Sequence, residues 1–285
     1  MKKKLAVMGL VSIMTMSMVA CGKDEKTSSN EPTSVITTDG GSEELSTEED
    51  TTEKKADNTD ELTDEYLLSL PETPADQFRY EEQDDGTIMI KGYKGEYIED
   101  TIIVIPGQID GKDVTCIKSN AFKNKLAKAI ITGANVSEIS GDAFLSVDVK
   151  KLVINGPVTK IYTDAFMNSK IGEVSFGEKV EEIGLKSFTN CKLKSIKIPS
   201  TIKLIDQAAF AMSDLEEVYF EGGNVKVCDL AFGKCKNLKK VYVPDCGITF
   251  EGGVFSYSDD VTIYTPSGST AEEYANDKGI KVENE

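Results

Sequence analysis

A short motif that ends in phenylalanine recurs at a nearly constant interval from residue 117 to residue 255 of this 285-residue chain. Most copies begin with Ile and end in Ala or Ser followed by Phe, as in Ile139-Ser-Gly-Asp-Ala-Phe144. The phenylalanines lie 22 residues apart five times and then 23 residues apart; they are Phe122, Phe144, Phe166, Phe188, Phe210, Phe232 and Phe255. A fixed period of this size indicates a repeat architecture, in which every copy forms one supersecondary unit.

The residues around each phenylalanine alternate between apolar and polar. Two apolar residues spaced by one position follow most copies, as at Val218 and Phe220, and a β-branched residue precedes the motif, as at Val180. This pattern predicts a short strand, a turn and a second extended piece in every copy. One copy cannot bury its apolar face alone, whereas stacked copies form a parallel ladder around a continuous core. We therefore expect a solenoid of about seven to eight coils with the phenylalanines in an internal column.

At these residues the chain resembles the BspA-like leucine-rich repeat family, whose repeats are also called LRR_5. The family pattern is an apolar strand followed by Val-x-x-Ile-x-x-x-Ala-Phe, and roughly residues 100–265 match it. A cysteine often lies three residues after the phenylalanine in this family, and Cys191 and Cys235 occupy that position here. The resemblance implies an α/β-type repeat solenoid over residues 78–285, a right-handed leucine-rich repeat coil made mostly of short parallel strands and turns.

The two ends of the repeat region resemble the caps of family members. Residues 78–95 resemble an N-terminal β-hairpin cap that leads into the first repeat strand. At the other end, Thr270 and Glu273 have capping-box spacing and Gly279 is a helix stop, which predicts a short helix over 271–278. Both elements would close the open ends of the core, as a solenoid requires.

Residues 1–22 are typical of a bacterial lipoprotein signal. Three lysines precede Leu5–Ala20, an uncharged stretch of 16 residues that is short for a spanning helix and typical of a signal-peptide core. The sequence Met18-Val19-Ala20-Cys21 resembles a lipobox, which implies a cell-surface lipoprotein held on the extracellular face of the membrane by lipid on Cys21. A lysine-rich signal and a long tether favour a Gram-positive envelope. The alternative is an ordinary secretory signal followed by a chance cysteine.

Residues 23–77 are predicted to form an acidic, Ser/Thr-rich disordered tether. Of the 43 residues from 23 to 65, 15 are acidic and 14 are Ser or Thr, and four lysines leave a net charge of −11. Such a segment cannot bury enough apolar surface to offset the entropy of ordering it. Residues 61–70 are its one candidate for a short helix, and the folded part is expected to begin near Phe78.

Composition excludes several classes of function. The chain has no His, so Ser–His–Asp and Cys–His catalytic groups and His-ligated zinc sites cannot form. A net charge of −17 argues against nucleic-acid binding, which needs clustered Lys and Arg. Five cysteines follow Cys21 at uneven spacing, which is typical neither of a disulfide framework nor of a zinc site. We expect no enzyme activity, no catalytic residues, no metal and no cofactor.

One file of residues points away from the core if the strands stack in register. These residues lie nine positions after each phenylalanine, the first being aligned by its strand, and they are Val104, Ile131, Val153, Ser175, Lys197, Tyr219, Tyr242 and Tyr264. Neighbouring outward positions add Lys151, Glu173, Glu217 and Lys240. Because Tyr is favoured at interfaces, we take six of these residues as the candidate binding face: Tyr219, Tyr242, Tyr264, Lys197, Lys240 and Glu217. The alternative is that the tyrosines only stabilise the ladder, as cross-strand aromatic pairs do.

These observations lead to the hypothesis of a non-catalytic recognition surface. The family resemblance implies adhesion or binding to a protein or glycan on a host, a matrix or neighbouring cells. A second hypothesis is a structural envelope protein that organises neighbouring surface components without an external ligand. A third is a hydrolase that uses carboxylates alone, which requires two convergent acids in a cleft.

Overall fold

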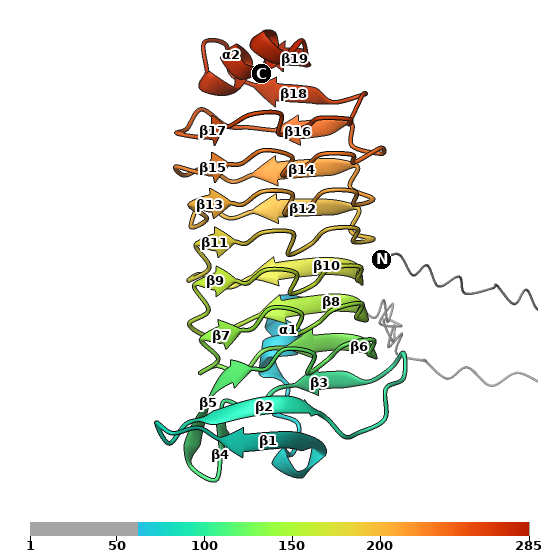
Figure 1. Ribbon diagram of the computed structural model, residues 1–285, viewed down its shortest axis with the longest axis vertical. Helices are drawn as coiled ribbons and strands as arrows, with labels where there is room; N and C mark the ends of the chain where they lie inside the picture. Colours follow the sequence, from blue (N-terminus) through green and yellow to red (C-terminus); the bar gives the residue numbers. More distant parts are fainter. Residues whose placement is uncertain (1–61, 285) are drawn as a thin grey trace, which may run out of the picture. The chain divides into compact units, whose positions relative to one another are not determined.

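The computed structural model describes residues 62–284. The predicted signal segment, the lipidation residue Cys21 and the predicted tether up to residue 61 lie outside the described residues. The described part is a stack of about nine turns, with the N-terminal hairpin at one end and the C-terminal helix at the other (Figure 1). The expected architecture, a solenoid of short parallel strands, is confirmed, and the end caps make the stack slightly longer than predicted.

Three sheets build the solenoid: a ten-stranded sheet on one side, and a four-stranded and a five-stranded sheet that follow one another on the other side (Figure 1). The first sheet consists of β1 (Phe78–Glu82), β2 (Ile88–Tyr93), β5 (Lys112–Ile117), β7 (Glu138–Ile139), β9 (Lys160–Ile161), β11 (Glu182–Ile183), β13 (Leu204–Ile205), β15 (Lys226–Val227) and β17 (Thr249–Phe250), with β4 (Gln108–Ile109) beside β5. The second sheet consists of β3 (Ile102–Val104), β6 (Leu126–Ile131), β8 (Asp148–Ile154) and β10 (Lys170–Phe176). The third consists of β12 (Ser195–Ile198), β14 (Glu217–Phe220), β16 (Lys240–Tyr242), β18 (Thr262–Thr265) and β19 (Lys281–Asn284).

The repeat interval sets the register of all three sheets. In the first sheet, Ile161, Ile183 and Ile205 occupy the same position on successive rungs. In the third sheet, Val218 and Val241 pair in the same way, and both are fully buried. Because strand side chains alternate between the two faces, the apolar positions of every rung point into one core between the sheets.

The recurring phenylalanines form the internal column that the sequence predicts. Phe122, Phe144, Phe166, Phe188, Phe210 and Phe232 are all fully buried. Successive rings in this group are stacked, with centroids 4.9 to 5.3 Å apart and planes within 15° of each other. Phe255 extends the column at a centroid distance of 5.8 Å. The ring spacing is close to the spacing of paired strands, so one ring belongs to each rung.

Each phenylalanine from Phe122 to Phe232 lies in a tight turn with two left-handed residues, one two positions before it and one two positions after it. Around Phe144 these are Asp142 and Ser146, with φ of 59° and 57°. Asn and Asp tolerate this conformation best, but Ala208 and Leu230 also adopt it, at a cost of roughly 1–2 kcal/mol each. Burial of the phenylalanine therefore imposes the turn even where the local sequence does not favour it.

From the third phenylalanine of the column onward, the position three residues after the phenylalanine carries a donor that links consecutive coils. The thiols of Cys191 and Cys235 donate to the carbonyl oxygen of the phenylalanine 25 residues earlier, at 3.1 and 3.2 Å. Serine hydroxyls donate to phenylalanine carbonyl oxygens in the alternate coils, at Ser169, Ser213 and Ser258. Burial raises the pKa of Cys191 to about 12, so this sulfur stays a protonated donor. The five cysteines of the described part are free thiols.

Both predicted caps are present. β1 and β2 form an antiparallel hairpin, and β2 then pairs in parallel with β5. At the other end, α2 (Thr270–Lys278) buries Ala271 and Ala275 and ends at Gly279 with φ of 67°. The N-cap is Ser269, whose Oγ accepts from the Glu272 backbone at 3.1 Å, rather than the predicted Thr270. The hydroxyl of Thr270 instead donates to the Ile248 carbonyl at 2.9 Å, which fixes the helix on the last coils.

Residues 62–77, hereafter the strap, are folded against the side of the solenoid, so the prediction that disorder extends to residue 77 is wrong for them. The strap contains α1 (Asp64–Ser69), which confirms the candidate helix, and a 3₁₀ turn at Ala75–Gln77. Leu67 of α1 is fully buried against three residues of the second sheet, Ala129, Ile131 and Val153. The acidic composition of the segment gave no sign of this contact, in which Leu62 and Leu70 also pack against the cluster around Leu67.

Polar contacts fix the strap at both of its ends. Asp64 Oδ1 lies 2.8 Å from the ammonium of Lys151 and accepts a hydrogen bond from Ser175 Oγ at 2.9 Å. Lys151 is 5% exposed and also pairs with Glu173. Burial alone would lower the pKa of Lys151, but its hydrogen bonds to Asp64 and Glu173 outweigh burial and raise the pKa, so the ammonium stays charged. Further along, the strap backbone at Thr73 donates to the edge strand β3 at the Val104 carbonyl.

We expect Phe188→Ala to lower the free energy of unfolding by about 3–5 kcal/mol, because it leaves a cavity in the middle of the phenylalanine column. Denaturant titration followed by circular dichroism measures the change. Tyr162→Ala is the control, since Tyr162 is 41% exposed and its loss should cost no more than about 0.5 kcal/mol. Equal stabilities of the two variants would contradict a shared aromatic core.

We expect Leu67→Ala to loosen the strap, because truncating a buried leucine costs about 2–5 kcal/mol. The readout is limited proteolysis with mass spectrometry, in which cleavage between residues 62 and 77 should accelerate while the repeats stay resistant. Leu68→Ala is a matched control on the same helix, since Leu68 is 51% exposed. Similar cleavage rates in the two variants would show that Leu67 does not hold the strap.

Candidate binding face

The outward file predicted from the sequence lies in register over both sheets on its side of the solenoid. Ile131, Val153 and Ser175 pair along the second sheet, and Lys197, Tyr219, Tyr242 and Tyr264 pair along the third. Val104 on β3 pairs with Ile131 and completes the file. The side chains of this file point away from the phenylalanine column, but the two sheets expose them differently.

The strap buries the first half of the file, which corrects the prediction that the whole file is exposed. Ile131 and Val153 are only 1% and 4% exposed because Leu67 lies on them. Lys151, predicted as an exposed neighbour of the file, is buried beneath Asp64. Apolar residues at outward positions were the sequence signal for such a cover, because a solvent-facing file would carry polar side chains.

The hydrogen-bonded ladder on this side is interrupted between β10 and β12, while the first sheet continues past the same level (Figure 1). Pro199 follows β12 and has no N–H, whereas its equivalent in the next coil, Glu221, donates to the Ile198 carbonyl at 2.9 Å. A groove of about 540 Å³ lies at the interruption and is bordered by Ser175 and Lys197. The interruption separates the strap-covered half of the face from the uncovered half.

The three tyrosines of the uncovered half form one stack. The ring centroids of Tyr219 and Tyr242 lie 4.6 Å apart with planes 3° from parallel, and those of Tyr242 and Tyr264 lie 4.9 Å apart with planes at 22°. All three side chains are half-buried, because each ring covers its neighbour. The faces of the middle ring are thus occupied, and the stack presents ring edges and hydroxyl groups to its surroundings.

Two charged residues of the candidate binding face hold the first tyrosine in place. The hydroxyl of Tyr219 donates to Glu217 Oε2, and the ammonium of Lys240 lies 2.9 Å from Glu217 Oε1. The hydrogen bond to Glu217 raises the pKa of Tyr219 to about 12. The hydrogen bond from Tyr219 and the neighbouring Lys240 lower the pKa of Glu217. The structure therefore brings four of the predicted residues into direct contact, and Tyr264 joins them through the stack.

The two ends of the tyrosine stack carry opposite charges. Lys197 is exposed and pairs in register with Tyr219 on the β12 side, and Glu283 of β19 pairs in register with Tyr264 on the other side. Sequence reasoning missed Glu283, because β19 follows the helix cap and lies outside the repeat pattern. The alternation in Lys281-Val282-Glu283 was the available signal for a further strand.

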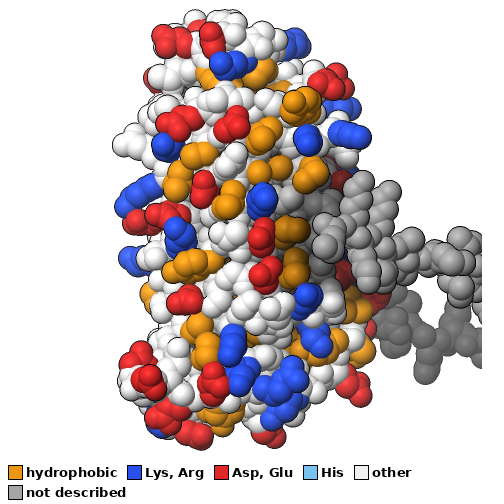
Figure 2. Space-filling model, in the orientation of Figure 1, with side chains coloured by type: hydrophobic (Ala, Val, Ile, Leu, Met, Phe, Trp, Pro, Cys, Tyr) orange, Lys and Arg blue, Asp and Glu red, His pale blue; other side chains and the backbone are white. Residues whose placement is uncertain are grey.

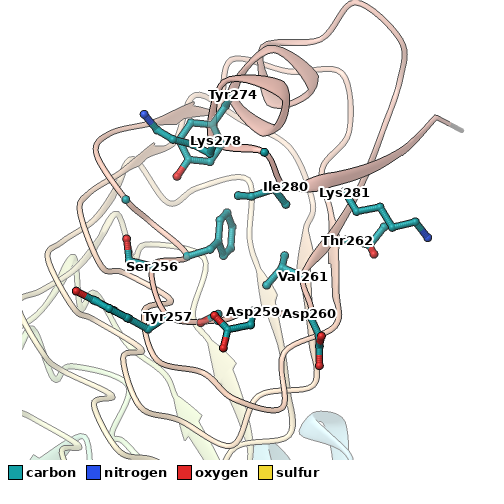
Figure 3. A pocket seen from close by; sticks show the side chains of 14 residues that line it. Ser256, Tyr257, Asp259, Asp260, Val261, Thr262, Tyr274, Lys278, Ile280 and Lys281 are labelled. Atoms are coloured by element: carbon teal, nitrogen blue, oxygen red, sulfur yellow. The ribbon is translucent and has the colours of Figure 1, made fainter.

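A second hollow of about 590 Å³ lies at the C-terminal end, between the last coil and the helix cap. Figure 3 shows Val261 and Ile280 directed into it, with Asp259 and Asp260 at its margin. The two acids are adjacent in sequence and lie on the same side, so they do not face each other across a cleft as glycosidase chemistry requires. Among residues 62–284, no group of His, Cys, Asp and Glu side chains is placed to hold a metal ion.

The surface charges are mixed in sign. On the face shown in Figure 2, acidic and basic side chains alternate with scattered hydrophobic ones along the whole stack. Many basic groups pair with an acid one coil away, as Lys194 does with Glu216 at 2.7 Å and Lys170 with Asp148 at 2.8 Å. None of the helices in the described part is both long enough and apolar enough to span a bilayer.

The parallel rungs, the aromatic column and the end caps define a leucine-rich repeat solenoid. The family described as BspA type Leucine rich repeat region matches the chain in 6 copies, over residues 105–172 and 137–262. These residues are more than half of the chain, and the chain belongs to this family. No curated protein matches it.

Three solved structures are similar to this chain. The leucine-rich repeat protein TpLRR of T. pallidum is 21% identical, over 75% of this chain and 98% of that protein, with a TM-score of 0.47. The pneumococcal vaccine antigen PcpA is 17% identical, over 67% of this chain and 48% of the antigen, with a TM-score of 0.46. A leucine-rich repeat protein from Bacteroides ovatus is 19% identical, over 75% of this chain and 67% of that protein, with a TM-score of 0.45.

We expect Glu217→Gln to lower the pKa of Tyr219 from about 12 toward the ordinary tyrosine value of about 10, because the charged acceptor is lost. The raised pKa favours the protonated phenol in the folded state, so its contribution to stability is complete below about pH 10 and disappears as the pH rises through about 12. Tyrosinate absorbance during an alkaline titration measures the change. Glu216→Gln is the control, since Glu216 pairs with Lys194 instead; identical titrations of the two variants would exclude the Tyr219–Glu217 bond.

Proposed function

We propose that this protein is a lipid-anchored bacterial surface protein whose uncovered sheet face binds a protein partner without catalysis. The observation that carries the proposal is the tyrosine stack, which is aligned by three consecutive rungs and which no segment of residues 62–284 covers. The same side of the solenoid is covered by the strap only over the second sheet. A repeat protein of this family has an extended surface suited to recognition, and the lipobox at Cys21 supports its display outside the cell.

The stack favours a protein over a glycan as the partner. Sugar rings pack on the open face of an aromatic ring, but here the faces of Tyr242 are covered by Tyr219 and Tyr264. The accessible groups are ring edges, hydroxyl groups and the charges of Lys197, Lys240 and Glu217. Aromatic residues with a polar tip and a charged margin are typical of protein interfaces.

The arrangement of acids supports a function without catalysis. Two of the four carboxylates that border the groove at the ladder interruption, those of Glu173 and Asp64, are paired with the ammonium of Lys151. On the candidate binding face, Glu217 is held by Tyr219 and Lys240. Carboxylates that are tied in this way do not provide the free acid and base that a carboxylate-only hydrolase needs.

The anchor is tested in bacteria that express the full chain and are fed a labelled fatty acid. We expect the wild type to carry the label and to be cleaved by protease added to intact cells. Cys21→Ala should lose the label because the acylated thiol is gone. The control Cys246→Ala removes a half-buried thiol of the repeat region and should keep the label. Label on the Cys21→Ala protein would contradict the lipobox assignment.

The binding face is tested with the same cells in a pull-down of matrix and envelope proteins. We expect the triple replacement of Tyr219, Tyr242 and Tyr264 by Ser to abolish partner capture, while circular dichroism shows that the repeats remain folded. The control replaces three exposed residues elsewhere by Ser: Tyr66, Tyr80 and Tyr162. Unchanged capture by the triple variant of the stack would show that the tyrosines serve only the ladder.

A further inference from the structure

The outward file on the third sheet is self-complementary. Along five paired strands it reads Lys197, Tyr219, Tyr242, Tyr264 and Glu283, in register throughout. A positive charge therefore stands at one end, a negative charge at the other, and three stacked rings lie between them. If two copies are related by a two-fold axis that passes beside Tyr242, the file of one copy runs antiparallel to the file of the other. Lys197 of each copy then faces Glu283 of the other copy.

The interval between the tyrosine rings equals the interval between strands, so it also matches the side-chain interval on the face of a second parallel sheet. The ring centroids are 4.6 and 4.9 Å apart, close to the separation of neighbouring strands. An extended peptide running along the file repeats its same-face side chains at about 6.6–6.8 Å, so it would fall out of step with the rings. Side chains on the face of a second parallel sheet repeat at the same interval as the tyrosines, and two such faces can pack about 10 Å apart.

The end charges are placed for contact with another molecule. Lys197 is exposed, and within residues 62–284 no carboxylate lies within ion-pair distance of it. Glu283 is exposed and pairs only locally, with Lys281 of its own strand. By contrast, Lys194 on the same strand as Lys197 is already paired with Glu216 of the next coil. Complementary charges at the two ends of a contact set its register and orientation.

We propose that this face binds a second copy of the same chain in an antiparallel arrangement, Tyr242 against Tyr242 and each Lys197 against the partner copy's Glu283. The inference rests on the proposed surface function and specifies the partner. The strap, through which the chain enters the solenoid, lies on the second sheet, whereas the tyrosine stack lies on the third. An antiparallel pair thus directs the two entry points away from each other, as two copies anchored on facing cells require.

The contact is small and therefore weak for a single pair of molecules. Five strands span about 20 Å along the axis, and a file a few residues wide covers much less than the roughly 800 Å² per partner of a stable complex. Many copies on one surface compensate, because simultaneous contacts raise the overall avidity by orders of magnitude. The contact is accordingly a property of densely displayed protein rather than of protein in dilute solution.

The test uses residues 22–285, the chain that follows the proposed lipidated cysteine, coupled by the N-terminal end to fluorescent beads of two colours. We expect wild-type beads to aggregate. Lys197→Glu makes both ends of the file acidic and Glu283→Lys makes both ends basic, so each variant alone should aggregate about tenfold less because like charges meet. Mixing the two variants pairs acidic ends with basic ends at both contacts and should restore aggregation between colours.

Matched controls separate the register from general charge effects. Lys203→Glu and Glu181→Lys carry the same changes in net charge, but these two residues pair with each other outside the tyrosine file. Beads with either control variant should aggregate as the wild type does. Dispersed wild-type beads at every density, or control variants that behave like the 197 and 283 variants, would overturn the proposed contact.

The outcome is independent of the anchor experiment, because the beads replace the lipid. In one outcome, Cys21 is lipidated and the tyrosines capture matrix or envelope proteins, but the beads stay dispersed. The proposed function then stands, and a second copy of the chain is excluded as the partner. If the beads aggregate as expected but Cys21 carries no lipid, the contact between copies stands and the proposed anchoring is wrong.

Discussion

Stacking of one phenylalanine per coil is the interaction on which the rest of the structure depends. The rings repeat at the spacing of hydrogen-bonded strands, so aromatic contact and backbone pairing reinforce each other at every rung. The turn around each ring requires left-handed residues even at Ala208 and Leu230, which shows that core packing overrides local preference. The same regular spacing aligns residues on the outer surface, and this alignment creates the tyrosine stack.

The repeat made much of this predictable from the sequence. A constant interval between phenylalanines fixes the register, and the register places Tyr219, Tyr242 and Tyr264 in one file without knowledge of the coordinates. The hairpin was expected from the family resemblance and the helix cap from local signals, although the capping residue is Ser269. The sequence placed Cys191 and Cys235 at one position of the repeat, while their equivalence to the serines of the alternate coils became visible only in the hydrogen bonds.

The features that escaped prediction depend on contacts between distant segments. The strap is acidic and lies outside the repeat pattern, and its order comes from Leu67 meeting a patch about 60 residues or more further along the chain. The burial of Lys151 depends on Asp64 in the same way. The ladder interruption near Pro199 and the extra strand with Glu283 arise where the repeat pattern is broken or has ended. The repeat interval carries no information about such places.

The lateral attachment of the strap determines how the protein responds to mechanical force. Tension on the chain before residue 62 reaches α1 first, and the contacts of Leu67 and Asp64 are few compared with those of any coil. We therefore expect α1 and the rest of the strap to detach from the solenoid before any repeat unfolds. The released residues 62–77 span at most about 50 Å when fully extended, at roughly 3.3 Å per residue. A pulled molecule thus lengthens while its solenoid stays intact, which dissipates a sudden load before it reaches the aromatic core.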